Sequence, residues 1–384
     1  MVAVSLGCGS DGTVDSAPVP ICETSYTLLN RSGGRVDWSK ANGKIAFDSA
    51  KLPEAAARGG FQTYTMNADG SDVRCVSCEA FGEGASVGQP AWGPEGRWIV
   101  VQVAFASCSL PDVLKHPGAG FSAELWAFDT ETGASRLLRE TACDASAGTL
   151  HPHFSEDGSK LVWGEASKRI DFSDPALNFG AWTLMVADVE WTSEGPSIGN
   201  TQSYQPGIEG FYESHSFDQT NRYLLHTATN QTQPGFQQTT LSELDLETGE
   251  VVVLASGGFN EHGAYTADQR SAIYMGDPER TEELARDGFR NNDIWVVRRN
   301  GDDPQKVTTF NVPGEFPLEV PGHPSPTTTY AATDLSTGPD PCAIVLVVNV
   351  NPGMAGPIAD ADDSVEPWIV KITSQEWASG PSTP

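Results

Sequence analysis

The stretch Pro90-Ala91-Trp92-Gly93-Pro94-Glu95-Gly96, followed by Trp98-Ile99-Val100-Val101, sets the pattern of the whole chain. An aromatic residue is followed by a turn that ends in glycine and then by an apolar strand. The same order recurs from Val36 to Phe47 and from His151 to Trp163, and weaker copies begin at Glu213 and Glu261. The copies start roughly 50 to 60 residues apart, slightly more than the period of about 40 to 45 residues expected for a four-stranded propeller blade.

Each copy continues into a further hairpin. Segments of strand and turn in these hairpins include 64–71, 125–133, 241–249 and 294–301, and each turn contains a glycine after a polar residue. Such residues supply the positive φ angles of tight turns, and the flanking β-branched and aromatic residues suit a pleated sheet. A short outer strand follows, for example Val251-Val252-Val253-Leu254. Four strands per repeat predict an all-β fold, a β-propeller.

Five blades are legible, beginning near residues 36, 89, 151, 213 and 261. An open fan of sheets would leave two unpaired edges, so we expect a sixth blade from about 320–375, closed by a strand at 26–30. The apolar segments 343–348 and 368–372 supply its strands. The prediction is therefore one six-bladed domain over 26–375, with seven blades as the alternative. Residues 1–25 are interpreted as a signal remnant and tether, and 376–384 as a flexible tail.

The repeat resembles the WD40-like (PD40) repeat of TolB-type periplasmic proteins. The matching residues include Ala46-Phe47 and Tyr64-Thr65-Met66-Asn67-Ala68-Asp69-Gly70, and the resemblance covers about residues 26 to 310. It implies an exported scaffold that binds a protein or a glycan through one rim. This is the favoured functional hypothesis.

Composition excludes some partners. The chain has 51 acidic and 23 basic residues, a formal net charge of −28. Nucleic acid binding depends on Lys and Arg that displace counterions from phosphates, so we expect no nucleic acid partner. The sequence contains no run of 18 apolar residues, so no membrane-spanning helix is predicted.

The N-terminus and the cysteines both favour an extracytoplasmic location. The segment 1–10 resembles the end of a bacterial lipoprotein signal, which implies acylation of Cys8 and a periplasmic, outer-membrane-anchored or secreted protein; a disordered start is the alternative. The other six cysteines suit disulfides in an oxidising compartment. Cys108 and Cys143 flank the outer hairpin of the second blade and are expected to pair. The full set of disulfide candidates is Cys22, Cys75, Cys78, Cys108, Cys143 and Cys342.

Four histidines and two glutamates occupy similar places in the repeat, at or just before the innermost strand. They are His151, His153, His215, His262, Glu213 and Glu261. Innermost strands of neighbouring blades converge on the axis, so these side chains are expected to meet at one mouth of the channel. Imidazoles with carboxylates suit a divalent transition metal such as Mn, Zn, Fe or Ni. The alternative is a set of polar residues held by hydrogen bonds and water.

His151-Pro152-His153 also resembles the metal-binding segment of manganese-dependent oligogalacturonate lyases. This implies the alternative function of a metal-dependent enzyme on acidic saccharides, in which Arg35 and Arg270 would neutralise a uronate. His215 departs from the pattern because it lies two residues before its aromatic, whereas His151 and His262 lie three before theirs. Strand alternation predicts that His215 points away from the axis.

Two weaker candidates remain. Asp360-Ala361-Asp362-Asp363-Ser364 with Glu366 offers oxygen ligands for Ca²⁺ but lacks the glycine of the calcium loop, and is typical of a solvated acidic loop. Aromatic residues in the longer connections could form a ligand-binding rim. They are Phe172, Phe179, Phe211, Tyr212 and Phe236.

Overall fold

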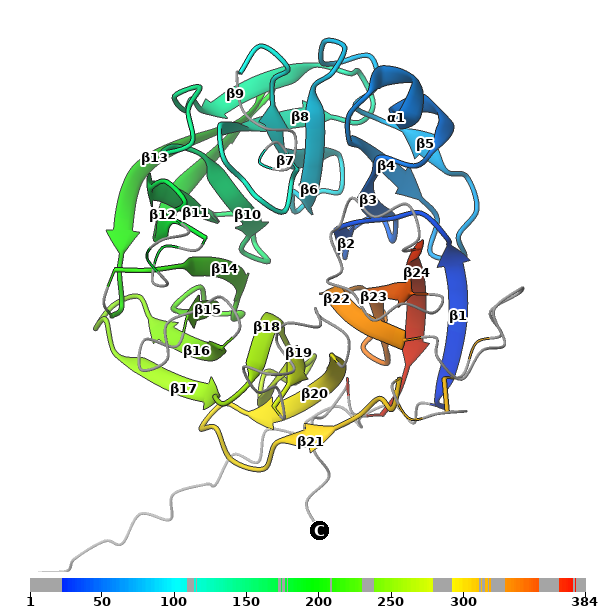
Figure 1. The fold of residues 1–384 in the computed structure, drawn as a ribbon, viewed down its shortest axis with the longest axis vertical. Coiled ribbons are helices and arrows are strands. Elements are labelled where there is room, and N and C mark those ends of the chain that lie inside the picture. Colours follow the sequence, from blue (N-terminus) through cyan, green and yellow to red (C-terminus); the bar gives the residue numbers. More distant parts are fainter. Residues whose placement is uncertain are drawn as a thin grey trace, which may run out of the picture.

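The computed structural model describes residues 23–108, 114, 116–171, 174, 177, 179–207, 209–229, 238–278, 292–310, 312, 315–316, 318, 329–351, 366–375 and 377. Within these ranges the strands form six antiparallel sheets of four strands each. The sheets are arranged around a central axis as a ring of blades (Figure 1). The six-bladed prediction is confirmed, and the seven-bladed alternative is wrong.

The first five blades run in chain order from the axis outward. Blade 1 contains β2 (Val36–Trp38), β3 (Ile45–Ser49), β4 (Gln62–Met66) and β5 (Arg74–Cys75), with the short helix α1 (Pro53–Arg58) between β3 and β4. Blade 2 contains β6 (Ser86–Trp92), β7 (Trp98–Ala104), β8 (Ala123–Asp129) and β9 (Ser135–Arg139). Blade 3 contains β10 (Thr149–Phe154), β11 (Lys160–Lys168), β12 (Ala181–Thr192) and β13 (Gly195–Tyr204).

The remaining blades follow the same order until the chain ends meet. Blade 4 contains β14 (Tyr212–Phe217), β15 (Tyr223–Thr229), β16 (Thr239–Asp245) and β17 (Val251–Ala255). Blade 5 contains β18 (Phe259–Tyr265), β19 (Ser271–Asp277), β20 (Asp293–Arg298) and β21 (Gln305–Lys306). Blade 6 contains β22 (Thr329–Thr337), β23 (Ala343–Asn351) and β24 (Glu366–Thr373), and β1 (Ser25–Asn30) from the N-terminal region is its outermost strand.

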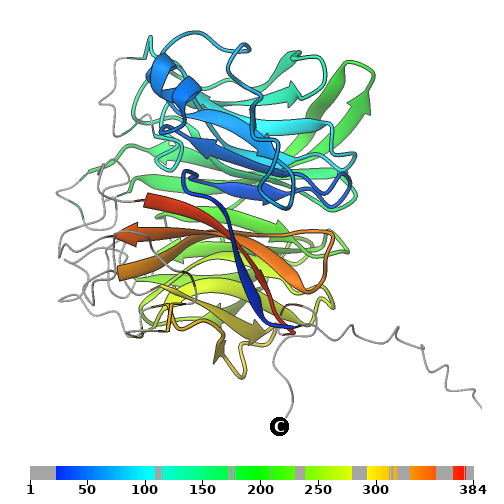
Figure 2. The same ribbon diagram turned by 90° about the vertical axis from the view of Figure 1, so that its right-hand side faces the viewer.

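The closing strand forms as the sequence predicts. β1 pairs antiparallel with β24, with Tyr26 opposite Ile372 and Leu28 opposite Val370 (Figure 2). The strand therefore joins two segments that are more than 300 residues apart in the sequence. It gives blade 6 its fourth strand and fixes both ends of the ring.

The core lies between the blades. Six clusters of buried apolar residues are found in the described ranges, and each joins one pair of neighbouring blades. The cluster between blades 6 and 1, for example, joins Val345 and Ile369 to Phe47 and Tyr64. Because both faces of an inner sheet are covered in this way, β3 and β7 are buried along their whole length.

The predicted hairpin turns have the expected backbone. Gly70, Gly133, Gly249 and Gly301 all have φ between 74° and 84°, a region that residues with a Cβ rarely adopt. No helix in the described ranges is both long and apolar enough to span a membrane.

Candidate functional site

A β-bulge recurs in the innermost strands. In each of β6, β10, β14 and β18, two residues lie opposite a single residue of the neighbouring strand. The irregularity falls between Gly88 and Ala91 in β6, Leu150 and His153 in β10, Ser214 and Phe217 in β14, and Glu261 and Ala264 in β18. The first extra residue of each bulge is Gln89, His151, His215 or His262. A bulge reorients the side chain that it carries, so these four residues occupy one equivalent position around the axis.

The bulge overturns one expectation from the sequence. His215 does not point away from the other imidazoles: its ring centroid lies 6.1 Å from that of His151 and 5.5 Å from that of His262. His151 and His262 are 4.7 Å apart by the same measure. The same bulge lies in β10, β14 and β18, so the register of these strands is given by the bulge and not by the aromatic from which the spacing was counted. Phe217 lies two residues after the first bulge residue, whereas Phe154 and Tyr265 lie three residues after theirs, so the aromatic is out of line and the histidine is not.

The three imidazoles and the two glutamates form one buried cluster. One nitrogen from each of His151, His215 and His262 lies within 4.8 Å of the others, and the same holds for one ligand atom each of Glu213, Glu261 and His262. All five residues are at most 5% exposed. His151 Nε2 lies 3.0 Å from Glu213 Oε1, and His262 Nε2 lies 3.7 Å from Glu261 Oε2.

Within each of these two groups of three, the separations are compatible with one metal ion. Metal–ligand bonds of about 2.0 to 2.2 Å place neighbouring ligands about 3 to 4 Å from one another. Glu213 Oε2 is buried without a hydrogen-bond partner among the described residues, while Oε1 of the same carboxylate lies against His151 Nε2. Buried polar atoms are usually satisfied, so an ion would supply the partner that this carboxylate oxygen lacks. Five of the six residues predicted from the sequence, all except His153, can therefore hold a metal.

Two residues outside the predicted set contact ring nitrogens of His262 and His215. Asp334 of β22 lies with Oδ1 3.0 Å from His262 Nδ1, and Thr227 of β15 lies with Oγ1 2.7 Å from His215 Nε2. Both are buried. The sequence carries no repeat signal for Asp334, since blade 6 lacks the aromatic-turn pattern of the other blades.

Hydrogen bonds link this ring of bulges from blade to blade. Asp48 Oδ2 accepts from the backbone N–H of Gln89 at 2.8 Å, and Gln89 Oε1 accepts from the N–H of His151 at 2.7 Å. Ser214 Oγ then donates to the carbonyl oxygen of His151 at 2.6 Å. Gln89, His151 and His262 have φ of 49°, 47° and 49°, which is strained for residues with a side chain. The links between blades hold the backbone in that conformation.

Burial dominates the electrostatics of the cluster. It lowers the pKa of His151 and of His153 to about 3, and it lowers the pKa of His215 and His262 as well. The same burial raises the pKa of Glu213. Burial also opposes ionisation of Asp334, but its hydrogen bond with His262 and the charges of His262 and Arg35 hold its pKa at about 2. Neutral imidazoles are the form that binds metals.

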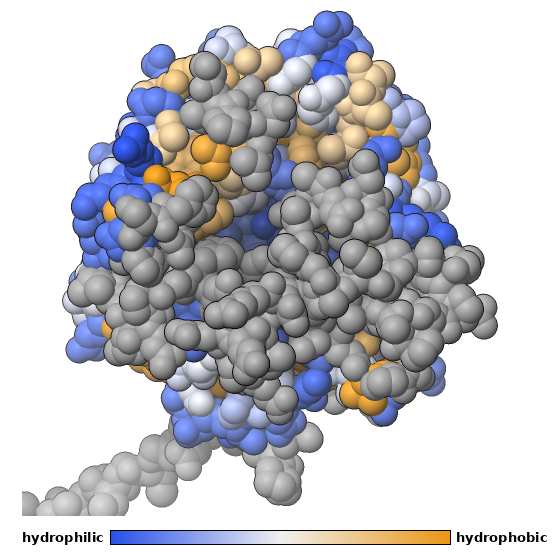
Figure 3. Space-filling view, viewed as in Figure 1, coloured by the Kyte–Doolittle hydropathy of each residue, from blue (hydrophilic) through white to orange (hydrophobic). Residues whose placement is uncertain are grey.

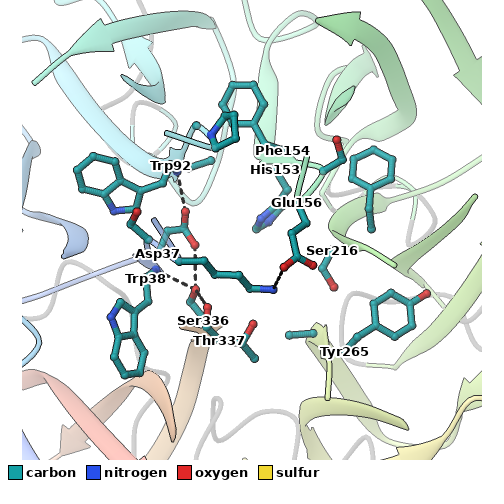
Figure 4. Close-up of a pocket in the computed structure, with 18 of the residues that line it drawn as sticks. Asp37, Trp38, Trp92, His153, Phe154, Glu156, Ser216, Tyr265, Ser336 and Thr337 are labelled. Carbon is teal, nitrogen blue, oxygen red and sulfur yellow. Dashed lines mark hydrogen bonds and ion pairs between the residues drawn. The ribbon is translucent and has the colours of Figure 1, made fainter. Parts of the chain in front are cut away.

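His153 differs from the other three histidines. It lines a mouth pocket at the face where the innermost strands end, together with Asp37, Trp92, Ser216, Tyr265 and Ser336 (Figure 4). Its ring centroid is 6.0 Å from that of His151, so it lies between this pocket and the cluster. Lys40 and Glu156 form an ion pair of 3.3 Å across the mouth. On the opposite face, a hydrophilic patch is visible near the axis (Figure 3).

The two predicted arginines lie in different places. Arg35 lines a second pocket with Asp48, Phe61 and His116, and its charge acts on His151 and Glu213. Arg270 lies in the turn after β18, where its side chain is 80% exposed and 4.0 Å from Asp268. The structure thus brings Arg35, but not Arg270, into the electrostatic surroundings of the cluster.

The predicted aromatic rim is partly corrected. Phe211 and Tyr212 are buried, at 2% and 1% exposure, in the core shared by blades 3 and 4. Phe179 packs on the same core, against Trp182 and Phe211. Their side chains pack in the core between blades 3 and 4 and so do not form a rim. Phe172 and Phe236 lie outside the described residues.

The cysteine predictions have several outcomes. Cys108 and Cys143 form a disulfide, which confirms the expected pair, and Cys75 bonds to Cys78. Cys342 is disulfide-bonded too. Cys8 and Cys22 lie outside the described residues, as do positions 360–365 of the acidic loop considered for Ca²⁺. Glu366 of that loop accepts a hydrogen bond from Trp368 Nε1 at 2.9 Å.

Comparisons with known proteins extend no further than weak similarity between structures. No protein-family model and no curated protein sequence matches the chain. An oligogalacturonate lyase in complex with manganese is 11% identical, with 91% of this chain and 90% of that chain covered and a TM-score of 0.49. An oligogalacturonate lyase from Vibrio parahaemolyticus is 12% identical, with 91% and 96% covered and a TM-score of 0.45.

A prolyl endopeptidase structure is also similar, at 13% identity and a TM-score of 0.42. The match covers 92% of this chain and 43% of that chain, so this chain spans less than half of the peptidase. At such low identity and TM-score no functional conclusion follows from these similarities.

Proposed function

We propose that this protein is a metal-dependent propeller that binds one divalent transition-metal ion at its axis. His151, His215 and His262 supply three nitrogen ligands, and Glu213 and Glu261 supply carboxylate oxygens. The observation that carries the proposal is the convergence of the three imidazoles, from three consecutive blades, within 4.8 Å. His215 follows His151 by 64 positions and precedes His262 by 47, and these residues meet because of the propeller closure and the repeated bulge.

The donor set favours a transition metal over Ca²⁺ or Mg²⁺. Imidazole suits Mn, Fe, Zn, Ni and Cu, whereas hard cations prefer sites made only of oxygen. A bound ion of this kind would supply Lewis-acid chemistry at the base of the mouth pocket. The Arg35 guanidinium lines the second pocket, not the mouth pocket, and its charge acts on His151 and Glu213, so it offers a counter-charge to an anionic group on that side of the cluster. We therefore propose an enzyme acting on acidic saccharides.

Elemental analysis of the purified protein tests the metal site. After loading with Mn²⁺ or Zn²⁺ and desalting, the parent is expected to retain about one equivalent, and a His151→Ala/His262→Ala double variant is expected to retain none. His226→Asn is the matched control, because His226 is a buried histidine that belongs to neither ligand group. A parent that retains no metal, or a double variant that retains as much as the control, would refute the proposal.

Protein binding is the second candidate function: the TolB-like resemblance implies binding through one rim, and the surface that we propose here is instead the outermost strand of blade 4. The outermost strand β17 exposes three consecutive valines, Val251, Val252 and Val253, to 37%, 43% and 50%. An exposed apolar edge strand can pair with an extended segment of a partner. A photo-crosslinker at Val253 should capture one partner in cells, and Val252→Lys should abolish the capture. Equal capture from Leu137 of β9 would contradict this function.

We also propose that the protein is exported. The two disulfides, Cys75–Cys78 and Cys108–Cys143, support this location because such bonds persist in oxidising compartments. Cell fractionation with thiol alkylation before lysis tests it. The proposal predicts that these four cysteines resist alkylation in cells, and their labelling as free thiols would contradict it.

A further inference from the structure

We infer that Asp334 is a positioning residue that fixes the tautomer and orientation of His262, so that Nε2 of this imidazole faces the metal. The inference rests on the proposed metal site and adds a residue that none of the ligand groups contains. Its basis is the set of hydrogen bonds around one buried carboxylate at the joint between the first and last blades.

Both oxygens of Asp334 are occupied by donors. Oδ2 accepts from the backbone N–H of Val36 at 2.8 Å, and Oδ1 accepts from the N–H of Leu335 at 2.9 Å. His262 Nδ1 lies 3.0 Å from Oδ1. A carboxylate with both oxygens engaged by N–H groups presents only an acceptor to the imidazole. The proton of neutral His262 must therefore reside on Nδ1.

The consequence for the cluster is chemical. With the proton on Nδ1, the lone pair of the imidazole is on Nε2, the nitrogen that lies 3.7 Å from Glu261 Oε2. Metal-bound histidines commonly donate their other N–H to a carboxylate, which fixes the ring and makes the ligand more basic. The opposite tautomer would direct an N–H toward the metal position. Asp334 thus prepares His262 for binding before any ion arrives.

Asp334 also connects the site to the closure of the ring. It lies in blade 6, it accepts from Val36 of blade 1, and it contacts His262 of blade 5. One side chain therefore contacts three consecutive blades at the joint where the two ends of the chain meet. Misplacement of blade 6 would remove the partner of His262, so formation of the metal site requires the closed propeller.

The test uses the tautomer as a readout that needs no metal. Protein with ¹⁵N-labelled histidine is examined without metal by long-range ¹H–¹⁵N correlation, which distinguishes Nδ1–H from Nε2–H imidazoles. The parent is expected to show His262 as Nδ1–H. Asp334→Ala removes the acceptor, so the Nε2–H form should appear and the affinity for Mn²⁺ or Zn²⁺ should fall about 10- to 100-fold. Asp334→Asn keeps an oxygen that can accept from Nδ1–H but loses the charge, and should lose less affinity.

Ser336→Ala is the matched control at the same joint. Ser336 Oγ accepts from Trp38 N–H at 2.9 Å and donates to Asp37 Oδ1 at 2.8 Å, and neither partner is a histidine. This variant should keep the parental tautomer and metal affinity. An Nε2–H imidazole at His262 in the parent, or equal metal affinity in Asp334→Ala and Ser336→Ala, overturns the inference. A parent with the expected tautomer that binds no metal overturns the proposed function instead.

Discussion

Acidification from pH 7 to pH 5 is expected to destabilise the metal-free protein by about 3 kcal/mol. The reason is the buried imidazoles: burial lowers the pKa of His151 and His153 to about 3 and that of His226 to about 4, from an ordinary value of 6.5. In the unfolded chain these histidines take up protons below pH 6.5, and in the folded protein they stay neutral. The unfolded state therefore binds more protons, and stability falls as the pH falls.

The magnitude follows from the width of the pH interval. Each of the three histidines contributes about 1.4 kcal/mol per pH unit between 6.5 and 5, or about 2 kcal/mol, which gives a loss of about 6 kcal/mol. Asp37 and Asp48 oppose it, because burial raises the pKa of each from 3.8 to about 6. They take up protons in the folded state between pH 6 and 5, which regains about 1.4 kcal/mol each. The net loss is therefore about 3 kcal/mol.

The other members of the cluster do not change the sign. The pKa of His215 and of His262 is lowered, so both add to the loss, whereas the raised pKa of Glu213 opposes it. Urea unfolding at pH 7 and pH 5, with a chelator present, measures the difference. His226→Asn should reduce the acid loss by about 2 kcal/mol, since it removes one of the three histidines. Equal or greater stability at pH 5 than at pH 7 would refute the reasoning.

Three further predictions concern packing, disulfides and metal. Gly88→Ala places a Cβ 2.5 Å from Asp48 Oδ2 and 2.6 Å from Pro117, and should cost about 1 to 3 kcal/mol in urea unfolding; Gly82→Ala, with nothing within 4 Å, is the control, and equal costs would contradict the prediction. Cys108→Ser/Cys143→Ser opens a disulfide between residues 35 apart and should lose about 3 to 4 kcal/mol, whereas Cys75→Ser/Cys78→Ser, with a separation of 3, should lose less; the reverse order would be inconsistent with loop entropy. Metal at about 1,000 times its Kd should stabilise the parent by about 4 kcal/mol, reversibly with chelator, and should leave His151→Ala/His262→Ala unaffected; equal stabilisation of both would place the metal elsewhere.

Local sequence signals were sufficient for most of the fold. The glycine turns, the aromatic entries and the apolar strands each depend on residues that are close in the sequence, so five blades could be recognised directly. The sixth blade followed from a physical requirement, the closure of sheet edges, and β1 confirms it. The pairing of Cys108 with Cys143 was predictable for a similar reason, because both flank one hairpin.

The site was predictable in its members but not in its geometry. His151, His262, Glu213 and Glu261 were identified from their place in the repeat, whereas His215 was assigned to the wrong face. The rule that side chains alternate along a strand does not include bulges, and a bulge is defined by the pairing with the next strand. The alignment of Gln89-Pro90 with His151-Pro152 was the available signal that blade 2 shares this position. Asp334 carried no such signal, because its strand lies in the one blade without the repeat.

The equivalent bulges explain why the three histidines lie at the same level along the axis and form one cluster. In a regular strand, a side chain at the axis would alternate with one buried between blades, and a difference of one residue in spacing would separate His215 from His151. The extra residue in β10, β14 and β18 places His151, His215 and His262 at the same level, although their spacing to the following aromatic differs. The left-handed backbone that the bulge imposes on His151 and His262 costs of order 1 kcal/mol or more at each residue. Hydrogen bonds from neighbouring blades, such as Gln89 Oε1 to His151 N–H, offset that cost, so the strained geometry of the cluster depends on the assembled ring.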